Sequence, residues 1–362
     1  MSLRTKKIIV GFFATLLTLV FTIAALIYAI TFHPKPIQAA AVTCPADTPT
    51  LTAGQSVKVL NYNVQYFAGK DYVFYYDVAD EAGPDTRPSP EAISKTFDDI
   101  AALIRQENPD VLLLQEVHEG AKATDYENQT ERLLSLIGDQ YPCYSEAFYW
   151  QAKFVPHPSI MGSVGMKLVT LSKYKLQSAQ RYQLTKMDSD PVTKAFNLKR
   201  AILTTEMPVQ GGEPLIAMNT HLDAFSQGMD TMDRQVAEVA TLLEATQQPW
   251  FIGGDFNLLP PDQYTALPDH QQIWYNPETE IAPLVRQYPS IPSMANVSGS
   301  DRERWFTHYP NDPLVKGPDR TIDYIFYDSR LTLEDSSVIQ DEAITLSDHL
   351  PVTAVFTLPE AN

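Results

Sequence analysis

Cysteine is scarce in this chain of 362 residues, which contains only Cys44 and Cys143. So low a count excludes a disulfide-rich scaffold, and no Cys/His spacing of a structural zinc site occurs. In an exported domain the two cysteines can form a disulfide, and the alternative is two unrelated buried thiols. Internal repeats and low-complexity tracts are also absent. With 44% hydrophobic residues, the chain can bury a large core as one domain or two.

Basic residues are also few, since 27 Lys and Arg stand against 44 Asp and Glu, for a formal net charge of -17. The first 40 residues hold four basic side chains and no acidic one, so the remainder carries 23 against 44, a balance of -21. A polyanion of this size repels nucleic acid at long range. The charge therefore disfavours a nucleic-acid substrate without excluding it.

One long apolar run lies near the N-terminus, where residues 8–32 contain no charged side chain. The run is long enough to cross a bilayer as a helix. Because Arg4, Lys6 and Lys7 precede it, the positive-inside rule places the N-terminus in the cytoplasm and the rest of the chain outside, in the periplasm or the extracellular space. The alternative is a secreted protein whose signal peptide is cleaved at the small residues 39–41.

The rest of the chain divides into a linker and one domain. Residues 1–32 form the membrane anchor, the Pro-rich residues 33–51 indicate a semi-rigid linker, and residues 52–358 form one domain. Strands alternate with helices around apolar runs, which is typical of an α/β layered protein. The expected strands are 57–64, 111–114, 164–171, 200–207, 215–219, 250–252, 321–327 and 352–358, and the expected helices are 90–104, 128–137 and 231–245.

Polar side chains follow or interrupt six of these strands. A carboxylate after a leucine run, such as Glu116, is unfavourable to bury unless it is paired or holds a cation. An ordinary strand-end cap is the commoner explanation for any one of them, but not for six together. Between the strand 250–252 and Asp255, we expect Gly253-Gly254 to break the strand and let the backbone approach a ligand. The polar groups are Asn61 and Asn63, Gln115-Glu116, Asn219-Thr220-His221, Asp255 and Asn257, Asp323, and Ser347-Asp348-His349.

This set is rich in oxygen ligands and contains no thiolate, which suits a hard cation such as Mg²⁺, with Mn²⁺ as a substitute. Glu116 is the expected principal ligand, beside Asn63 and Asp348. The two histidines, His221 and His349, suit proton transfer near neutral pH.

The ordered motifs Tyr-Asn-Val (62–64), Leu-Gln-Glu-Val (114–117), Asn-Thr-His-Leu (219–222), Gly-Gly-Asp-Phe-Asn (253–257), Ile-Asp-Tyr-Ile (322–325) and Ser-Asp-His-Leu-Pro-Val (347–352) resemble those of the endonuclease/exonuclease/phosphatase superfamily. This is the deoxyribonuclease I-like family of Mg²⁺-dependent phosphoesterases, and the resemblance covers roughly residues 57–357. It implies a four-layer αββα sandwich, in which two packed, mostly antiparallel sheets are flanked by helices and the site lies at one rim.

The resemblance also implies roles. His349 is similar to the histidine that takes a proton from the attacking water, and Asp323 to the acid that orients it. Asp255 and Asn257 resemble the pair that lines the water and the phosphoryl oxygens. His221 resembles the second histidine, which binds the phosphate or protonates the leaving oxygen. Family members differ on whether Asp255 or His349 is the base, so both stay open.

In nuclease-like members the histidine corresponding to His221 has a carboxylate partner, for which Asp223 and Asp188 are candidates here. Its motif looks more like those of the sphingomyelinase, inositol-phosphatase and secreted-nuclease branches than that of abasic-site repair. Lys199 and Arg200 are weaker candidates for binding the substrate phosphate.

Three further patterns carry less weight. The pair 234–235 resembles one that supports the site in relatives. The aromatic clusters 72–76 and 148–150 can form a lip that touches a lipid or a base.

These observations predict a membrane-tethered, Mg²⁺-dependent phosphodiesterase outside the cytoplasm. Its substrate is nucleic acid, a sphingomyelin- or phosphoinositide-type lipid, or a small phosphoester. The competing hypothesis is a binding module that kept the fold and lost the reaction. No protein partner is predicted.

Overall fold

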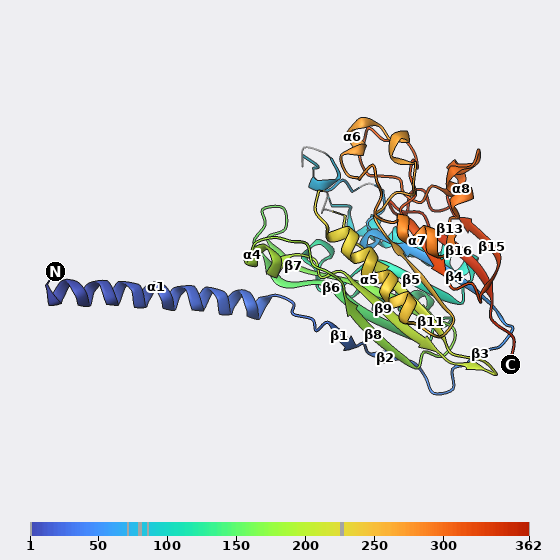
Figure 1. Cartoon of the computed structure of the whole chain (residues 1–362), viewed down its shortest axis with the longest axis horizontal. Coiled ribbons are helices and arrows are strands. Elements are labelled where there is room, and N and C mark those ends of the chain that lie inside the picture. Colours follow the sequence, from blue (N-terminus) through green and yellow to red (C-terminus); the bar gives the residue numbers. More distant parts are fainter. Residues whose placement is uncertain (1, 71, 79–81, 85–86, 225–227, 362) are drawn as a thin grey trace.

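Two facing β-sheets with helices on both outer sides form the domain (Figure 1). The computed structural model describes residues 2–70, 72–78, 82–84, 87–224 and 228–361. Each sheet has seven strands and is mostly antiparallel, with the parallel pairs β4–β5 in the first and β11–β12 in the second. The four-layer αββα sandwich expected from the family resemblance is therefore confirmed.

The first sheet has the order β15–β16–β4–β5–β7–β6–β2, with the strands Thr332–Val338, Val352–Thr357, Ser56–Asn63, Val111–His118, Gly162–Ser172, Cys143–Val155 and Val42–Thr43. The second has the order β1–β8–β9–β11–β12–β14–β13, with the strands Ile37–Ala39, Ser178–Gln183, Ala201–Met207, Leu215–His221, Trp250–Asp255, Asp323–Tyr327 and Ser290–Ile291. A separate two-stranded pair joins β10 (Val209–Gln210) to β3 (Leu51–Thr52).

Helices cover the outer face of each sheet. The first sheet is covered by α2 (Pro90–Glu107) and α3 (Gln129–Ile137), and the second by α5 (Thr231–Ala245) and α7 (Ala282–Gln287). The α2 helix begins as expected, because the Ser89 hydroxyl accepts a hydrogen bond from the backbone N–H of Ala92 and Pro90 is the first helical residue. Shorter helical turns lie in the connections: η1 (Gln65–Phe67), η2 (Tyr75–Asp77), η3 (Lys122–Thr124), α4 (Pro191–Phe196), η4 (Tyr264–Ala266), α6 (Asp269–Gln272), α8 (Met294–Ser298) and η5 (Arg302–Trp305).

The hydrophobic core follows from the two-residue period of the strands. In β4, Val57 and Val59 face the second sheet, whereas Leu60 and Tyr62 pack against α2. The other central strands divide their side chains in the same way, so a dry layer fills the space between the sheets and a second layer fills each helix–sheet interface. The side chains that face the other sheet are the ones that become polar at one end of the strands.

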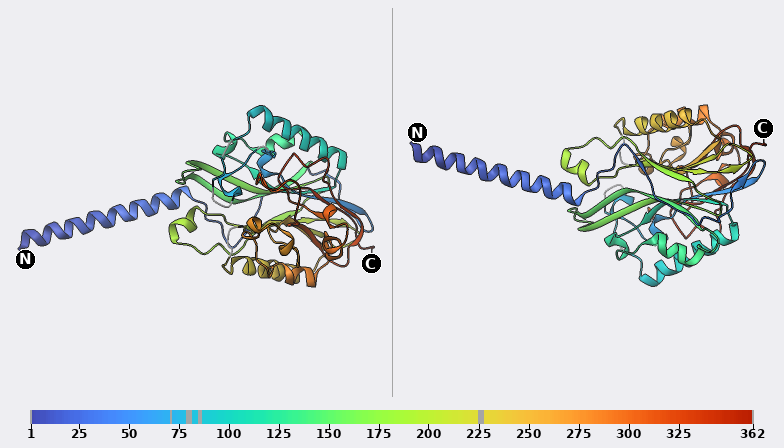
Figure 2. Two further views of the ribbon diagram at one scale, coloured as in Figure 1. Left: turned by 90° about the horizontal axis from the view of Figure 1, so that it is seen from above. Right: turned by 90° about the horizontal axis from the view of Figure 1, so that it is seen from below.

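Helix α1 (Leu3–Ile30) projects away from the domain, and none of its residues is buried (Figure 2). It is long and apolar enough to cross a membrane, which agrees with the expected anchor.

The segment after α1, expected as a semi-rigid linker over residues 33–51, pairs with the domain at two sheet edges. Its strand β1 pairs with β8 at the edge of the second sheet, and β2 pairs with β6 at the edge of the first. A disulfide between Cys44 and Cys143 fixes it to the domain, which resolves the alternative left open by the sequence. We call residues 31–44 the strap. The prolines suggested a spacer, but unpaired sheet edges are available to pair with the segment between them.

Candidate active site

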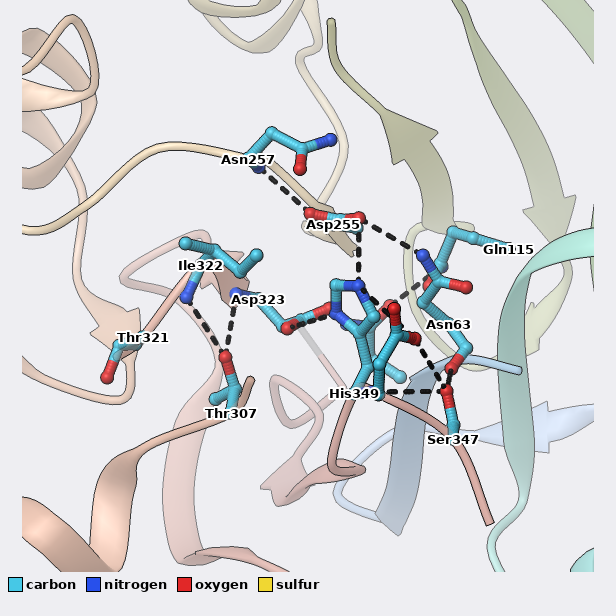
Figure 3. A network of polar contacts seen from close by, with 12 residues as sticks. Asn63, Gln115, Asp255, Asn257, Thr307, Thr321, Ile322, Asp323, Ser347 and His349 are labelled. Carbon is cyan, nitrogen blue, oxygen red and sulfur yellow. Dashed lines mark hydrogen bonds and ion pairs between the residues drawn. The ribbon is translucent and has the colours of Figure 1, made fainter. Parts of the chain in front are cut away.

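The site residues all lie on the inward-facing side of their sheets. Along each strand they follow the inward-facing core residues at the two-residue period. On β4, Asn61 and Asn63 follow Val57 and Val59 at the two-residue period and therefore face the second sheet. The same holds for Gln115 on β5, Asn219 and His221 on β11, Asp255 on β12 and Asp323 on β14. We call the end of the sheets where these side chains meet the rim, and Figure 3 shows the contacts of Asn63, Asp255 and Asp323 among them.

His349 and Asp323 form a buried pair at the rim. The Nδ1 atom of His349 lies 2.9 Å from Oδ2 of Asp323, and the backbone N–H of Asp323 donates to the hydroxyl of Thr307 (Figure 3). Burial disfavours the charged imidazolium of His349, but the carboxyls of Asp323, Asp255 and Asp348 outweigh it and raise the His349 pKa above its ordinary value. The sequence paired these two side chains correctly. Thr307 lies in no recognisable motif and was missed.

Glu116 reaches the rim through a β-bulge. By simple alternation it would point toward α2, on the same side as Leu112 and Leu114. The pairing of β5 with β7 shifts register between Leu114 and Val117, and Glu116 adopts a positive φ of 59°. This residue turns the carboxylate back into the site, and bulges and backbone strain of this kind are over-represented at functional sites.

Asn63 joins two buried carboxyls. Its amide nitrogen donates to Oε1 of Glu116 at 3.2 Å and to Oδ2 of Asp255 at 3.1 Å, while its oxygen accepts from the backbone N–H of Gln65. Burial and the nearby Asp348 raise the pKa of Glu116 to about 7, and burial raises the pKa of Asp255 to about 7. Two carboxyls that burial makes hard to ionise define a place where a cation would be stabilised.

The donor set at this place fits a hard divalent cation. Carboxylate oxygens of Glu116 and Asp255 lie beside the amide of Asn63, Asp348 is close enough to Glu116 to raise its pKa, and no thiolate lies among them. Groups of three candidate ligands lie within 4.8 Å of one another, including Glu116 with His221 and Asp255. Oxygen ligands with few nitrogens favour Mg²⁺ or Mn²⁺ over zinc.

His221 has a phenol as a partner on its Nδ1 atom. The Tyr149 hydroxyl lies 3.1 Å from Nδ1, and Nε2 lies 3.2 Å from Oδ2 of Asp255. Burial, followed by the charges of Arg200 and His349, lowers the His221 pKa well below its ordinary value. A neutral His221 that accepts from Tyr149 carries its proton on Nε2, directed at Asp255.

Asp188, one of the two carboxylates expected to pair with His221, does not do so. It is exposed and forms an ion pair with Lys194 at 3.0 Å. Tyr149 was missed because it lies in the aromatic strand β6, where alternation alone assigns it to the core.

Asn257 and Asp348 also reach the rim. Asn257 has a positive φ of 55°, and its backbone N–H donates to Oδ1 of Asp255 at 2.9 Å. Asp348 is held by Gln65, whose side-chain oxygen accepts from the Asp348 backbone N–H at 3.1 Å. The ring of His308, which sequence reasoning missed, lies 4.5 Å from that of His349.

Lys199 and Arg200, predicted together, have different surroundings. The Lys199 ammonium donates to three backbone carbonyls, of residues 194, 195 and 197, so it is a structural group and not a phosphate ligand. The Arg200 guanidinium is only 4% exposed and lies over the ring of Tyr149, 5.3 Å from its centroid. Its Nε and Nη1 atoms are buried without a hydrogen-bond partner, and the residue lines the same pocket as His221. An unpaired guanidinium in this position is suited to bind a phosphoryl oxygen.

The Gly-Gly pair does not break its strand, contrary to the expectation. Strand β12 continues through both glycines to Asp255. A Cβ atom on Gly254 would lie 2.3 Å from the Thr220 carbonyl oxygen, and one on Gly253 would lie 2.7 Å from the Leu113 side chain in the other sheet. The glycines therefore allow close packing of strands and sheets beside the site.

Of the two residues at 234–235, which resemble a pair that supports the site in relatives, only one lies close to the rim. Gln235 is buried and accepts from the backbone N–H of Asp223, close to the rim. Arg234 lies on the surface and pairs with Asp230.

A single pocket of about 620 Å³ contains the site. Its lining includes Glu116, Asp255 and His349 together with apolar residues of α4, of the end of β6 and of the β6–β7 connection. Both aromatic clusters expected to form a lip contribute to it, through Tyr75 and Trp150 among others.

Comparison with known proteins agrees with this geometry. The model of the Endonuclease/Exonuclease/phosphatase family matches residues 60–349. The chain is 26% identical over 161 residues to a UPF0294 protein of Yersinia enterocolitica, covering 44% of this chain and 50% of the relative. A UPF0294 protein of Vibrio vulnificus is 26% identical over 164 residues, covering 45% and 47%. The chain thus spans about half the length of the curated relatives it matches.

Two solved structures have a similar fold. An endonuclease/exonuclease/phosphatase from Beutenbergia cavernae has a TM-score of 0.57 at 22% identity, with 85% of this chain and 72% of that chain covered. The human Nocturnin catalytic domain, solved with a bound sulfate anion, has a TM-score of 0.52 at 17% identity, with 88% and 96% covered.

Proposed function

The chain belongs to the endonuclease/exonuclease/phosphatase family, and on that premise we propose that it is a metal-dependent phosphodiesterase tethered to a membrane. Members of this family are generally hydrolases of phosphoester bonds. One observation carries the proposal: His349, Asp255 and Glu116, which are far apart in the sequence, line one pocket with Arg200, whose buried Nε and Nη1 atoms have no hydrogen-bond partner among the described residues.

The proposed reaction adds water across a P–O bond, giving a phosphate monoester and an alcohol. The water loses its proton to Nε2 of His349 or to Oδ2 of Asp255, two atoms only 3.5 Å apart, so one bound water reaches both. Asp323 holds the other ring nitrogen of His349 and fixes its orientation. The proton taken from the water ends on the leaving alcohol oxygen, to which the Nε2–H of the neutral His221 donates a hydrogen bond.

Charge at phosphorus is balanced by cationic and polar groups. We propose that Glu116, Asn63 and Asp348 hold Mg²⁺, for which Mn²⁺ can substitute. The bound ion supplies positive charge to the phosphoryl oxygens. Arg200 and Asn257, which line the pocket, donate to the same oxygens as negative charge develops on them.

We also propose that α1 spans a membrane with the N-terminus in the cytoplasm and the domain outside. The basic residues before α1 favour this orientation. The Cys44–Cys143 disulfide supports it, because disulfides persist in oxidising compartments.

Turnover of bis-p-nitrophenyl phosphate by the full chain in detergent tests the reaction. We expect Mg²⁺-dependent hydrolysis that EDTA abolishes and that falls by about a thousandfold in His349→Ala and Glu116→Gln. Glu342→Gln, at an exposed carboxylate away from the rim, is the matched control and should retain full activity. Equal rates for the wild type and both site variants would reject the enzyme in favour of a binding module on the same fold.

A further inference from the structure

The pairing of the strap shows which end of the domain faces the membrane. Thr31, directly after α1, forms an antiparallel bridge with Ala152 on β6. The chain runs away from α1 as it enters the strap, so the antiparallel β6 runs toward α1, and its connection to β7 lies at the α1 end. Strand β1 of the strap pairs antiparallel with β8, so the β8–β9 connection, which contains α4, lies at that end too (Figure 1).

The site lies at the same end of the sheets. Strand β11 pairs antiparallel with β9 and ends at His221, beside the start of β9, where Thr220 lies opposite Ile202. In the first sheet, β5 ends at His118, opposite Met166 near the start of β7. The rim therefore opens between the two connections that return toward α1.

The position of the membrane surface follows from the length of α1. Residues 8–30 are uncharged and span ~34 Å as a helix, against a hydrocarbon core of ~30 Å. The outer surface of the bilayer then falls within the last turn of α1, near Tyr28, an aromatic residue of the kind enriched at such interfaces. Strand β6 continues for three residues from Ala152 to Val155, which corresponds to ~10 Å along the strand. The tip of the β6–β7 connection therefore lies closer to the bilayer surface than Ala152 does.

Both connections expose apolar side chains at this end. Phe154, near the end of β6, is 40% exposed, Met161 on the β6–β7 connection is 51% exposed, and Val192 on α4 is 52% exposed. Residues 153–162 contain a lysine and no acidic residue, although the chain as a whole is strongly acidic. Exposed apolar residues beside a membrane-spanning helix are suited to enter the interfacial layer, which side chains penetrate by about 5–10 Å.

The same pocket is lined by residues near both connections and by the proposed catalytic residues. Val155 at the end of β6, Ile160 of the β6–β7 connection, and Val192 and Phe196 of α4 line the same pocket as Glu116, Asp255 and His349. A phosphoester with an apolar tail matches this lining, with the phosphate at Arg200 and the tail directed at the bilayer. Long nucleic acid would meet a domain with a charge balance of -21.

We infer that the β6–β7 connection and α4 rest on the bilayer that α1 crosses, and that the pocket takes a phospholipid from the adjoining leaflet as its substrate. This inference rests on the proposed phosphodiesterase function and specifies its substrate class. Hydrolysis follows the reaction given above, with the lipid phosphodiester as the ester and the alcohol as the leaving group.

Hydrolysis by the full chain reconstituted in vesicles tests the substrate. Vesicles of phosphatidylcholine, of phosphatidylcholine with phosphatidylglycerol, and of phosphatidylcholine with sphingomyelin distinguish the head groups. We expect Phe154→Asp and Met161→Asp to lower lipid hydrolysis by at least about tenfold while soluble bis-p-nitrophenyl phosphate turns over at the wild-type rate, because charge at these positions opposes entry into the interface. Leu314→Asp, at a 70% exposed apolar residue outside both connections, should leave both rates unchanged.

The outcomes separate this inference from the proposed function. A wild type that hydrolyses the soluble ester but none of the vesicle lipids overturns the inference alone, as does a Phe154→Asp variant that cleaves lipid at the wild-type rate. A wild type that hydrolyses neither overturns the proposed function.

Fluorescence gives a readout that does not depend on activity. Phe154→Trp in vesicles containing brominated phosphatidylcholine should be quenched more than the wild type, whereas Leu314→Trp should not. No added quenching in Phe154→Trp would refute membrane contact.

Discussion

The buried carboxyl of Glu116 should make the metal-free protein less stable as the pH rises. Burial, aided by the charge of Asp348, raises its pKa from 4.5 to about 7. Between these values the folded state holds a proton that the unfolded state has released, so the free energy of unfolding decreases with pH through this window. Because one pKa unit corresponds to about 1.4 kcal/mol, the expected loss is about 3 kcal/mol once the pH exceeds 7.

Added Mg²⁺ should reverse this loss, because Glu116 binds a cation only after losing its proton. The stabilisation by Mg²⁺ is therefore expected to be small near about pH 5 and to reach several kcal/mol near about pH 8. Urea unfolding of the full chain in detergent, with EDTA or with Mg²⁺ at each pH, measures both effects.

Glu116→Gln is the control, since it keeps an oxygen for the Asn63 amide and removes the titrating group. In EDTA its stability should decrease less than that of the wild type between the two pH values. If the wild type instead gains stability relative to Glu116→Gln as the pH rises, or if Mg²⁺ stabilises it equally at both pH values, the reasoning fails.

Three further predictions follow from the same geometry. Asp323→Asn should lower kcat by about a hundredfold or more with little change in KM, because His349 loses the carboxylate that orients it; unchanged kinetics would contradict the pairing. Tyr149→Phe should lower kcat by about tenfold and alter the pH–rate profile, because the His221 tautomer is no longer fixed, while Tyr144→Phe on the same strand should have no effect. Replacing Cys44 and Cys143 by serine should lower the free energy of unfolding by about 4 kcal/mol, given a sequence separation of 99 residues, and unaltered urea midpoints would count against the disulfide.

The sequence predicted the site well because its chemistry follows strand ends. Asn63, His221, Asp255 and Asp323 continue the inward-facing alternation of their strands, so a polar residue at the right parity is directed at the rim. Glu116 breaks this rule, because a bulge cannot be found by alternation, and its position after a leucine run and in a family motif indicated it instead.

The missed features depend on tertiary pairing. Strand β6 spans Cys143–Val155 and is the longest in the protein among the described residues, yet its alternation mixes aromatic and charged side chains and looked like a surface lip. Lys167 on β7 is fully buried and pairs with Glu146 on β6 at 2.7 Å, a contact that no local pattern reveals. Tyr149 belongs to the aromatic cluster 148–150 that was expected to form a lip, and its contact with His221 was not foreseen. Thr307 and His308 belong to a connection that is ordered by its neighbours.

The strap has a consequence for export. Residues 39–41, the candidate cleavage site of a signal peptide, comprise the last residue of β1 and the two residues that connect it to β2. Proteolysis there would separate β1 from the chain and leave β8 as a bare edge strand, open to pairing with other chains. A released form would therefore be prone to self-association, whereas the uncut chain keeps both borders of its sandwich closed by its own leader-proximal residues.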